Sequence, residues 1–506
     1  MNTTATSYDE VPYESVAYAE THPDRLATIA TLFGLTPPKV DACRVLELGC
    51  ASGGNLIPMA QGLPGSHFIG LDLSSREIAD GLQCVEALGL KNIELRALSI
   101  TEVDASFGQF DYIICHGVFS WVPREVQEKI LAICAHHLSP QGVAYISYNT
   151  FPGWHTRGMI RDMMRFHSGR FDTSQQRVQQ ARALIDFLAI SVTNKDGPYG
   201  LMLKQELEIL RQMSDSYLLH EHLEEVNEPL FFHEFITRAR PHGLRYLGEA
   251  DVHGMAANSF PEEVQSTLRR LTADQVESEQ YLDFLRHRTF RRTLLVRAGA
   301  AISHTVPAER IAAFQVASNA EPVGAEEDPC SDREEEFRGP NGIILRTTDP
   351  LFKAAMRYLG GKWPHAVPFT ELREAARARL GGDASDATLA ESDTRELGSR
   401  LLRCYTSSAL IELHVHLPPF AAVAGERPIG SPFARWQAAR GARVTNLRHE
   451  NGPIPDAERR LLIALDGTLD RAAIGKMIAP NSPPDAQRAA TEATLARAAQ
   501  LAMLLA

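Results

Sequence analysis

The sequence predicts an α/β protein built on a doubly wound, mostly parallel sheet of seven strands, with further domains after it. Within residues 44–150, short apolar runs alternate with helix-like segments, a glycine-rich turn follows the first run, and an acid ends the second. Alternating strands and helices of this kind form parallel sheets that bind ligands at the carboxyl ends of their strands. The length of 506 residues leaves room for two to four domains.

The first strand and its turn are the most informative segment. Val45–Leu48 predicts a buried strand, and Gly49 and Gly53 allow the following chain to approach a ligand closely before a helix begins near Asn55. Asp72 ends the second predicted strand, where the acid of a doubly wound fold accepts hydrogen bonds from a ribose. These features predict a nucleotide-like ligand across the turn.

The spacing of this turn distinguishes two classes of ligand. A dinucleotide requires G-x-G-x-x-G and a helix N-terminus for its phosphates, whereas this chain has Glu47-x-Gly49-x-x-x-Gly53. Glu47 would repel a phosphate, but it suits S-adenosylmethionine (AdoMet), which carries an ammonium and a sulfonium. The motif therefore resembles the signature of class I AdoMet-dependent methyltransferases.

This resemblance implies a set of cofactor contacts on four strands. In class I methyltransferases the third strand usually ends in an acid beside the adenine, but Ser99 takes that place here. A hydroxyl can still accept a hydrogen bond from the exocyclic amine. The expected cofactor-binding residues are Glu47, Gly49, Cys50, Ala51, Gly53, Asn55, Asp72, Leu73, Leu98, Ser99 and Cys115.

Later segments supply the remaining elements of this fold. Two strand-like runs near residues 244–249 and 292–297 would complete the sheet as its sixth and seventh strands, the last one antiparallel as in class I methyltransferases. A break at 196–200 divides a helical stretch that precedes them. The other predicted elements are strands at 92–99, 110–116 and 143–148 and helices at 124–138 and 154–167.

Changes in composition suggest the domain boundaries. Residues 1–165 and 232–302 form the expected AdoMet-binding core, and residues 166–231 form a helical insertion. The acid-rich segment 303–338 is expected to be a linker in which like charges repel. Residues 339–506 mix amphipathic helices with short strand-like runs, which predicts an α/β C-terminal domain of winged-helix type.

Composition also limits the partners and the compartment. The net charge of −12, without a dense Lys/Arg run, argues against a nucleic-acid partner. The seven cysteines lack C-x-x-C pairs, which indicates reduced thiols. The chain has no apolar run of the roughly 20 residues needed to span a bilayer, and its N-terminus does not resemble a signal peptide. We therefore expect a cytoplasmic enzyme without stable membrane insertion.

Three longer sequence segments point to a more specific family. The segments Cys115–Pro123, Ser147–Trp154 and His220–Phe235 resemble bacterial methyltransferases that carry a methyltransferase regulatory domain. That family includes protein-lysine methyltransferases that act on bacterial outer-membrane proteins. The likeness covers Tyr8 to Arg297 and continues loosely through Leu465–Asp470. It implies a protein substrate that is methylated on lysine.

Methyl transfer to lysine requires an uncharged amine in line with the S–CH3 bond. At pH 7 only about one lysine in 2,500 is neutral, so the pocket must favour loss of the proton. Aromatic side chains can hold the cation while they exclude water. The expected catalytic residues are His116, Asn149 and Tyr13, and the expected substrate contacts are Phe119, Trp121 and Trp154.

Several alternatives remain open from the sequence. Phe119 and Trp121 fit core packing equally well, and His116 fits a hydrogen-bonded structural histidine. The group His220, His222 and His233 lacks a closed set of four metal ligands, so we expect no metal. A small-molecule N- or O-methyltransferase and a non-catalytic AdoMet-binding regulator are the rival functions. The C-terminal domain would bind the protein substrate or hold two subunits together as a homodimer.

Overall fold

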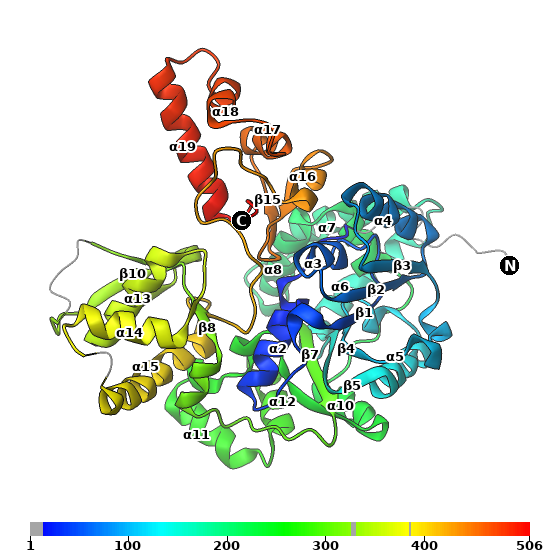
Figure 1. Cartoon of the computed structure of the whole chain (residues 1–506). Coiled ribbons are helices and arrows are strands. Elements are labelled where there is room, and N and C mark those ends of the chain that lie inside the picture. The colour runs from blue at the N-terminus through cyan, green and yellow to red at the C-terminus, as the bar shows by residue number, and fades with distance from the viewer. Residues whose placement is uncertain (1–13, 325–329, 384–385) are drawn as a thin grey trace.

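The structure, a computed structural model, describes residues 14–324, 330–383 and 386–506 (Figure 1). It confirms the predicted seven-stranded sheet, whose strand order is β3-β2-β1-β4-β5-β7-β6. Only β7 is antiparallel, to both β5 and β6. The strands are β1 (Arg44–Leu48), β2 (His67–Asp72), β3 (Ile93–Ala97), β4 (Phe110–Cys115), β5 (Leu138–Asn149), β6 (Leu244–Glu249) and β7 (Phe290–Arg297).

Both faces of the sheet are buried, as in other sheets built from crossover units. Successive side chains of a strand point to opposite faces, so Val45 joins one apolar cluster and Leu46 the other. The helices α2 (Pro23–Leu32), α3 (Leu56–Gly62) and α4 (Ser75–Leu88) contribute to the first cluster. The helices α5 (Arg124–His137) and α10 (Phe232–Ala239) contribute to the second.

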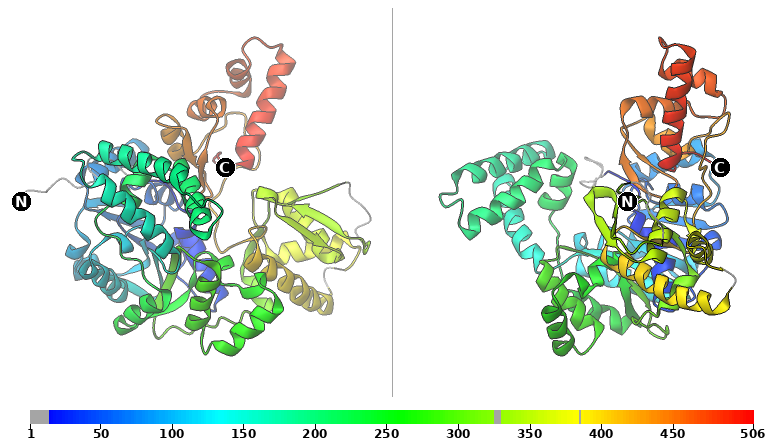
Figure 2. Two further views of the ribbon diagram at one scale, coloured as in Figure 1. Left: turned by 180° about the vertical axis from the view of Figure 1, so that it is seen from behind. Right: turned by 90° about the vertical axis from the view of Figure 1, so that its left-hand side faces the viewer.

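A helical module stands between β5 and β6 along the chain. It comprises α6 (Gly153–Ser168), α7 (Ser174–Ser191), α8 (Pro198–Gln212) and a π-helical turn at Leu218–Leu223. Ile160 and Met164 of α6 join its apolar core, so this core begins before residue 166. In the right view of Figure 2 the module projects to the side of the molecule away from the C-terminal arm.

The segment 303–338, expected as an acidic linker, instead contributes strands to a folded module. In it β8 (Gln315–Ala317) pairs with β12 (Val367–Pro368) and β13 (Glu412–His414). Glu335 pairs with Arg357 at 2.5 Å and Glu336 with Arg346 at 3.0 Å, which offsets the repulsion expected between the acids. Residues 325–329 of the acidic run lie outside the described residues. The module also contains β9 (Glu321–Pro322), β10 (Glu335–Arg338), β11 (Ile344–Thr347), α13 (Pro350–Lys362), α14 (Phe369–Arg379) and α15 (Ala387–Ser407).

A second C-terminal module forms the arm at the top of Figure 1. Its first helix, α16 (Pro432–Ala438), packs against α3 and α4 of the core. Gln61 of α3 accepts a hydrogen bond from the backbone N–H of Phe433 at 2.7 Å and donates one to Ser431 at 3.1 Å. The arm continues through the hairpin β14 (Arg443–Thr445) and β15 (Asn451–Pro453) to α17 (Asp456–Ala464), α18 (Arg471–Ile478) and α19 (Pro484–Gln500).

None of the helices in the part of the chain that the structure describes is long and apolar enough to cross a bilayer.

A buried charge cluster joins β6, β7 and α12 (Gln275–Arg286). Arg291 of β7 is fully buried and contacts Glu249 at 2.7 Å, Asp283 at 2.8 Å and Glu279 at 3.1 Å. Its guanidinium lies 3.7 Å from the centre of the Phe232 ring. Arg291 thereby holds the two strands that end the sheet to a helix, and Arg288 adds a second contact with Asp283 at 2.9 Å.

Replacement of this cation is expected to destabilise the protein strongly. Arg291→Met leaves three buried carboxylates without their shared partner, which should lower the free energy of unfolding by about 3 to 5 kcal/mol. Urea denaturation would measure the loss. Arg269→Met is the control, because Arg269 forms an exposed ion pair with Glu262 that should contribute less than about 1 kcal/mol. Equal effects of the two substitutions would contradict the expectation.

Candidate active site

The turn after β1 depends on glycine at two points. Gly49 has φ of 78° and Gly53 φ of 76°, in the left-handed region that favours glycine. A Cβ on Gly49 would lie only 2.4 Å from Cγ2 of Val118. The backbone N–H groups of Gly49 and Cys50 both donate to the carbonyl of Leu71, at 2.8 and 2.9 Å. The first turn is thus tied directly to the end of β2.

Asp72 accepts hydrogen bonds from the turn after β1 and from the turn after β2. Its Oδ2 accepts from the backbone N–H of Ala51 at 2.8 Å, and its Oδ1 accepts from the N–H of Ser74 at 2.9 Å. A carboxylate oxygen can accept more than one hydrogen bond, so these contacts orient the group without exhausting it. Leu73, the next residue, is 65% exposed. An exposed apolar side chain beside a carboxylate suits the base and ribose of a nucleoside.

Glu47 is buried at the carboxyl end of β1. Its Oε1 accepts a hydrogen bond from Asn55 Nδ2 at 2.7 Å, whereas its buried Oε2 has no hydrogen-bond partner among the described residues. Burial raises the pKa of Glu47 to about 8, and the nearby charge of Asp72 adds to the effect. An unsatisfied buried carboxylate oxygen fits the ammonium of an amino-acid ligand such as AdoMet.

Asn55 has a different environment from the one expected of a cofactor contact. Its amide group is occupied by protein groups on every side: Nδ2 donates to Glu47 and Thr21, and Oδ1 accepts from Tyr18, Thr21 and His449. The side chain is buried. The structure thus shows Asn55 holding Glu47 in place through a hydrogen bond of 2.7 Å.

The residues expected to contact the adenine differ in their exposure and in the atoms that they can offer to a ligand. β3 ends at Ala97, and Ser99 caps a short helical turn, where its Oγ accepts from the N–H of Thr101 at 3.2 Å. Leu98 is half-buried, and Cys115 is completely buried in the core. The thiol of Cys115 packs against apolar neighbours, so this residue can offer a ligand only its backbone.

His116 follows β4 and lies among aromatic rings. Its Nδ1 shares a hydrogen bond with the Tyr145 hydroxyl at 2.8 Å, and the Tyr18 ring centre is 3.9 Å from its own. Burial lowers the pKa of His116 to about 3. Such a ring is neutral at pH 7 and is a poor base, which favours a hydrogen-bonding role. Tyr13, the third expected catalytic residue, lies outside the described residues.

The expected substrate contacts separate into two groups. Phe119 is fully buried and packs edge-to-face on Phe235 at 5.3 Å between ring centres, so its environment is that of the core alternative. Trp121 is half-buried and meets Trp154 edge-to-face at 6.1 Å. Asn149, at the end of β5, donates from Nδ2 to Asn227 at 3.0 Å.

An open cavity of about 580 Å³ adjoins the end of β5. The Phe151 ring stacks on His155 at 4.1 Å between ring centres, and Trp154 contributes to the same wall. Asp162 supplies a carboxyl group. Of the expected residues, Trp154 lines this cavity, whereas Trp121 contacts Trp154 and Asn149 contacts Asn227 of the lining. Other residues of its lining include Met159, Arg161 and Asn227.

Three residues at these two sites were not predicted from the sequence: Tyr18 and His449, which contact Asn55, and Asn227, which lines the cavity. Asn227 lies inside the His220–Phe235 phrase that carried the family resemblance, so that phrase offered a signal. Tyr18 and His449 lie in segments without a motif. Their contacts with the site span 37 and 394 residues along the chain, a separation that periodicity cannot detect.

Comparison with known protein families identifies three regions of the chain. Residues 46–144 match a methyltransferase domain, and residues 214–297 match a predicted methyltransferase regulatory domain. Residues 426–482 match the C-terminal winged helix domain of PKMT, which confirms the expected winged helix.

Two relatives align with almost the whole chain. An uncharacterized protein, RP789, from Rickettsia prowazekii is 39% identical over 92% of this chain and 84% of its own length. The structure of PKMT2 from Rickettsia typhi is 31% identical, with a TM-score of 0.87, over 98% of this chain and 100% of that one. PKMT2 has also been solved in complex with AdoHcy, with a TM-score of 0.88 to this chain. The chain therefore belongs to the PKMT2 family of class I AdoMet-dependent methyltransferases with a regulatory domain and a C-terminal winged helix.

Proposed function

We propose that this methyltransferase acts on lysine side chains of proteins. The observation that carries the proposal is the full-length similarity to PKMT2, which includes the regulatory and winged-helix regions as well as the sheet. A protein acceptor requires a broad surface, and the aromatic cavity beside β5 is open enough to receive a side chain from another protein.

We assign the cofactor contacts as follows. Glu47 pairs with the ammonium through Oε2, Asp72 accepts from the ribose hydroxyls, and the exposed face of Leu73 packs on the adenine. When bound, AdoMet supplies an electrophilic methyl group on its sulfonium. The backbone of the first turn lies against the ligand; the residues that we assign to this contact are Gly49, Cys50, Ala51 and Gly53, with Leu98, Ser99 and Cys115 at the neighbouring strand ends.

We place the acceptor amine between Trp121, Trp154 and Asn149. Because Asn149 Nδ2 is engaged by Asn227, its Oδ1 is the atom that we propose accepts a hydrogen bond from the amine. The surrounding rings exclude water, which lowers the pKa of an entering lysine and favours the neutral nucleophile. Neutral His116 contributes a hydrogen-bonding group at the adjacent end of β4.

We further propose that the enzyme works in the cytoplasm without a nucleic-acid partner. Five of the seven cysteines are buried and no disulfide joins them, as expected of a protein kept in a reducing compartment. The net charge of −12 disfavours contact with phosphate backbones.

The acceptor assignment can be tested directly with methyl-labelled AdoMet and a whole-cell protein extract. We expect label in the protein fraction and, after acid hydrolysis, in methylated lysine. Label confined to small molecules would contradict a protein acceptor, and label on another amino acid would contradict lysine. Absence of transfer would support a non-catalytic AdoMet-binding protein instead.

AdoMet affinity is expected to rise with pH. The ammonium favours ionised Glu47, whose pKa is about 8 before the cofactor binds, so binding below that pH must release a proton. Affinity should therefore increase by up to about tenfold per pH unit between pH 6 and 7.5, where an α-ammonium is still charged. Calorimetric titration at several pH values would measure this change.

Glu47→Gln provides the matched control. The amide keeps the size of the side chain but does not ionise, so binding should become weaker and lose most of its pH dependence. The same steep rise in both proteins would show that another group is responsible.

Substitution of Trp121 tests the proposed acceptor pocket separately from the cofactor site. Trp121→Leu should lower the rate of protein methylation about three- to thirtyfold through loss of the cation–π contact with the charge that develops on the amine as it is methylated, while AdoMet affinity changes little. Phe119→Ala is the control, because truncation of that buried ring should lower the free energy of unfolding by about 3 to 5 kcal/mol. Methylation assays and denaturation curves would separate the two effects. An equally destabilised Trp121 variant would identify that ring as a packing residue.

A further inference from the structure

We propose that His449, in the C-terminal winged helix, is a positioning residue for the AdoMet site and acts through Asn55 and Glu47. The inference rests on the proposed contact between Glu47 and the cofactor ammonium. It assigns to the C-terminal region a role besides binding a protein substrate or a second subunit: completion of the cofactor site itself.

Two hydrogen bonds connect the winged helix to the first turn of the sheet domain. His449 lies in the loop between β14 and β15, and its Nε2 is 2.9 Å from Asn55 Oδ1. Asn55 Nδ2 is in turn 2.7 Å from Glu47 Oε1. All three side chains are buried, so water cannot easily replace either contact.

The surroundings fix the direction of each hydrogen bond. The backbone N–H of Tyr18 can only donate, and it lies 3.0 Å from Asn55 Oδ1. The oxygen of the Asn55 amide therefore faces Tyr18 and His449, and the nitrogen faces Glu47. Because Nε2 of His449 meets an acceptor, it must carry the hydrogen. Burial lowers the pKa of His449 well below its usual value, so the ring is neutral and has a single donor.

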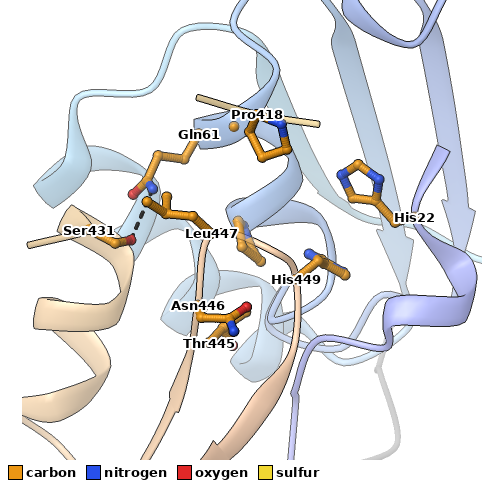
Figure 3. Close-up of a pocket in the computed structure, with 10 residues that line it drawn as sticks. His22, Gln61, Pro418, Ser431, Thr445, Asn446, Leu447 and His449 are labelled. Atoms are coloured by element: carbon orange, nitrogen blue, oxygen red, sulfur yellow. Dashed lines mark hydrogen bonds between the residues drawn. The ribbon is translucent and has the colours of Figure 1, made fainter. Parts of the chain in front are cut away.

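The β14–β15 loop is shaped to present this ring to the core (Figure 3). His449 has φ of 63°, an unfavourable conformation for a residue other than glycine. Asn446 Oδ1 accepts from the N–H groups of Arg448 and Glu450, each at 2.9 Å, and the Leu447 N–H donates to the Ala502 carbonyl at 2.9 Å. The winged-helix module thus holds His449 in a strained conformation that directs it at Asn55.

Loss of the His449 side chain should weaken AdoMet binding more than it slows methyl transfer. Without its donor, the Asn55 oxygen keeps only its contacts with Tyr18 and Thr21, so the amide can shift and Glu47 is held less firmly in its orientation toward the ammonium. We expect His449→Leu to weaken AdoMet binding roughly five- to tenfold, as for loss of one buried hydrogen bond. The KM for AdoMet should rise in parallel, whereas kcat at saturating AdoMet should stay within about twofold of the wild type.

Three variants of the full-length protein test the mechanism. His449→Gln places an amide N–H near the original Nε2 and should restore most of the affinity. His449→Asn, whose amide is too short to reach Asn55, replaces the leucine variant if that variant does not fold. Ser431→Ala is the matched control: it removes a hydrogen bond of the same interface, to Gln61 at 3.1 Å (Figure 3), and the N-terminal cap of α16 at Ala434, neither of which leads to Asn55. It should leave AdoMet affinity unchanged.

A double-mutant cycle separates this inference from the cofactor assignment on which it rests. If His449 acts through Glu47, then His449→Leu should have little further effect on AdoMet affinity in a Glu47→Gln background. Independent effects of the two substitutions on AdoMet affinity would show that His449 does not act through Glu47. So would an unchanged affinity in His449→Leu, or an equal loss in Ser431→Ala. If Glu47→Gln itself left affinity unchanged, the assignment of Glu47 to the ammonium would fail first, whichever result His449 gave.

Discussion

The buried hydrogen bond between Glu47 and Asn55 is the contact on which the rest of the site depends. A carboxyl group at the end of a central parallel strand is costly to bury, and here one of its oxygens is satisfied by a single side-chain amide. That amide also receives the N-terminal segment, through Tyr18 and Thr21, and the winged helix, through His449. Three distant parts of the chain therefore meet at one residue beside the glycine turn.

The sequence predicted best what depends on local patterns. The first two strands, the turn at Gly49 and Gly53 and the acid at Asp72 were recognised because the apolar pattern of a strand and the placement of glycines in a turn are visible within a few residues of sequence. Antiparallel β7 was predicted only through the family resemblance. The strands within 303–338 were not predicted, because the arginines that neutralise Glu335 and Glu336 come from a later helix and strand. Composition cannot show such pairing.

The site was harder to predict than the sheet, for a physical reason. Phe119 and Trp121 are two residues apart in one helical turn, yet one packs in the core and the other lies beside the aromatic cavity. A sequence shows that both are aromatic but not which way each ring points. Similarly, nothing in the sequence around Asn55 indicates that its amide would be surrounded by protein groups, since one of its partners is 394 residues away.

The convergence on Asn55 has a consequence for how the enzyme matures. Tyr18, Asn55 and His449 are synthesised at very different times, so a growing chain can form the sheet long before it can complete the contacts that hold Glu47. AdoMet would then stabilise the folded protein fully only after the winged helix has docked, because a ligand stabilises the state that binds it. Fragments that end before the arm would lack this stabilisation and be more exposed to proteolysis. The cofactor would thus favour retention of complete chains.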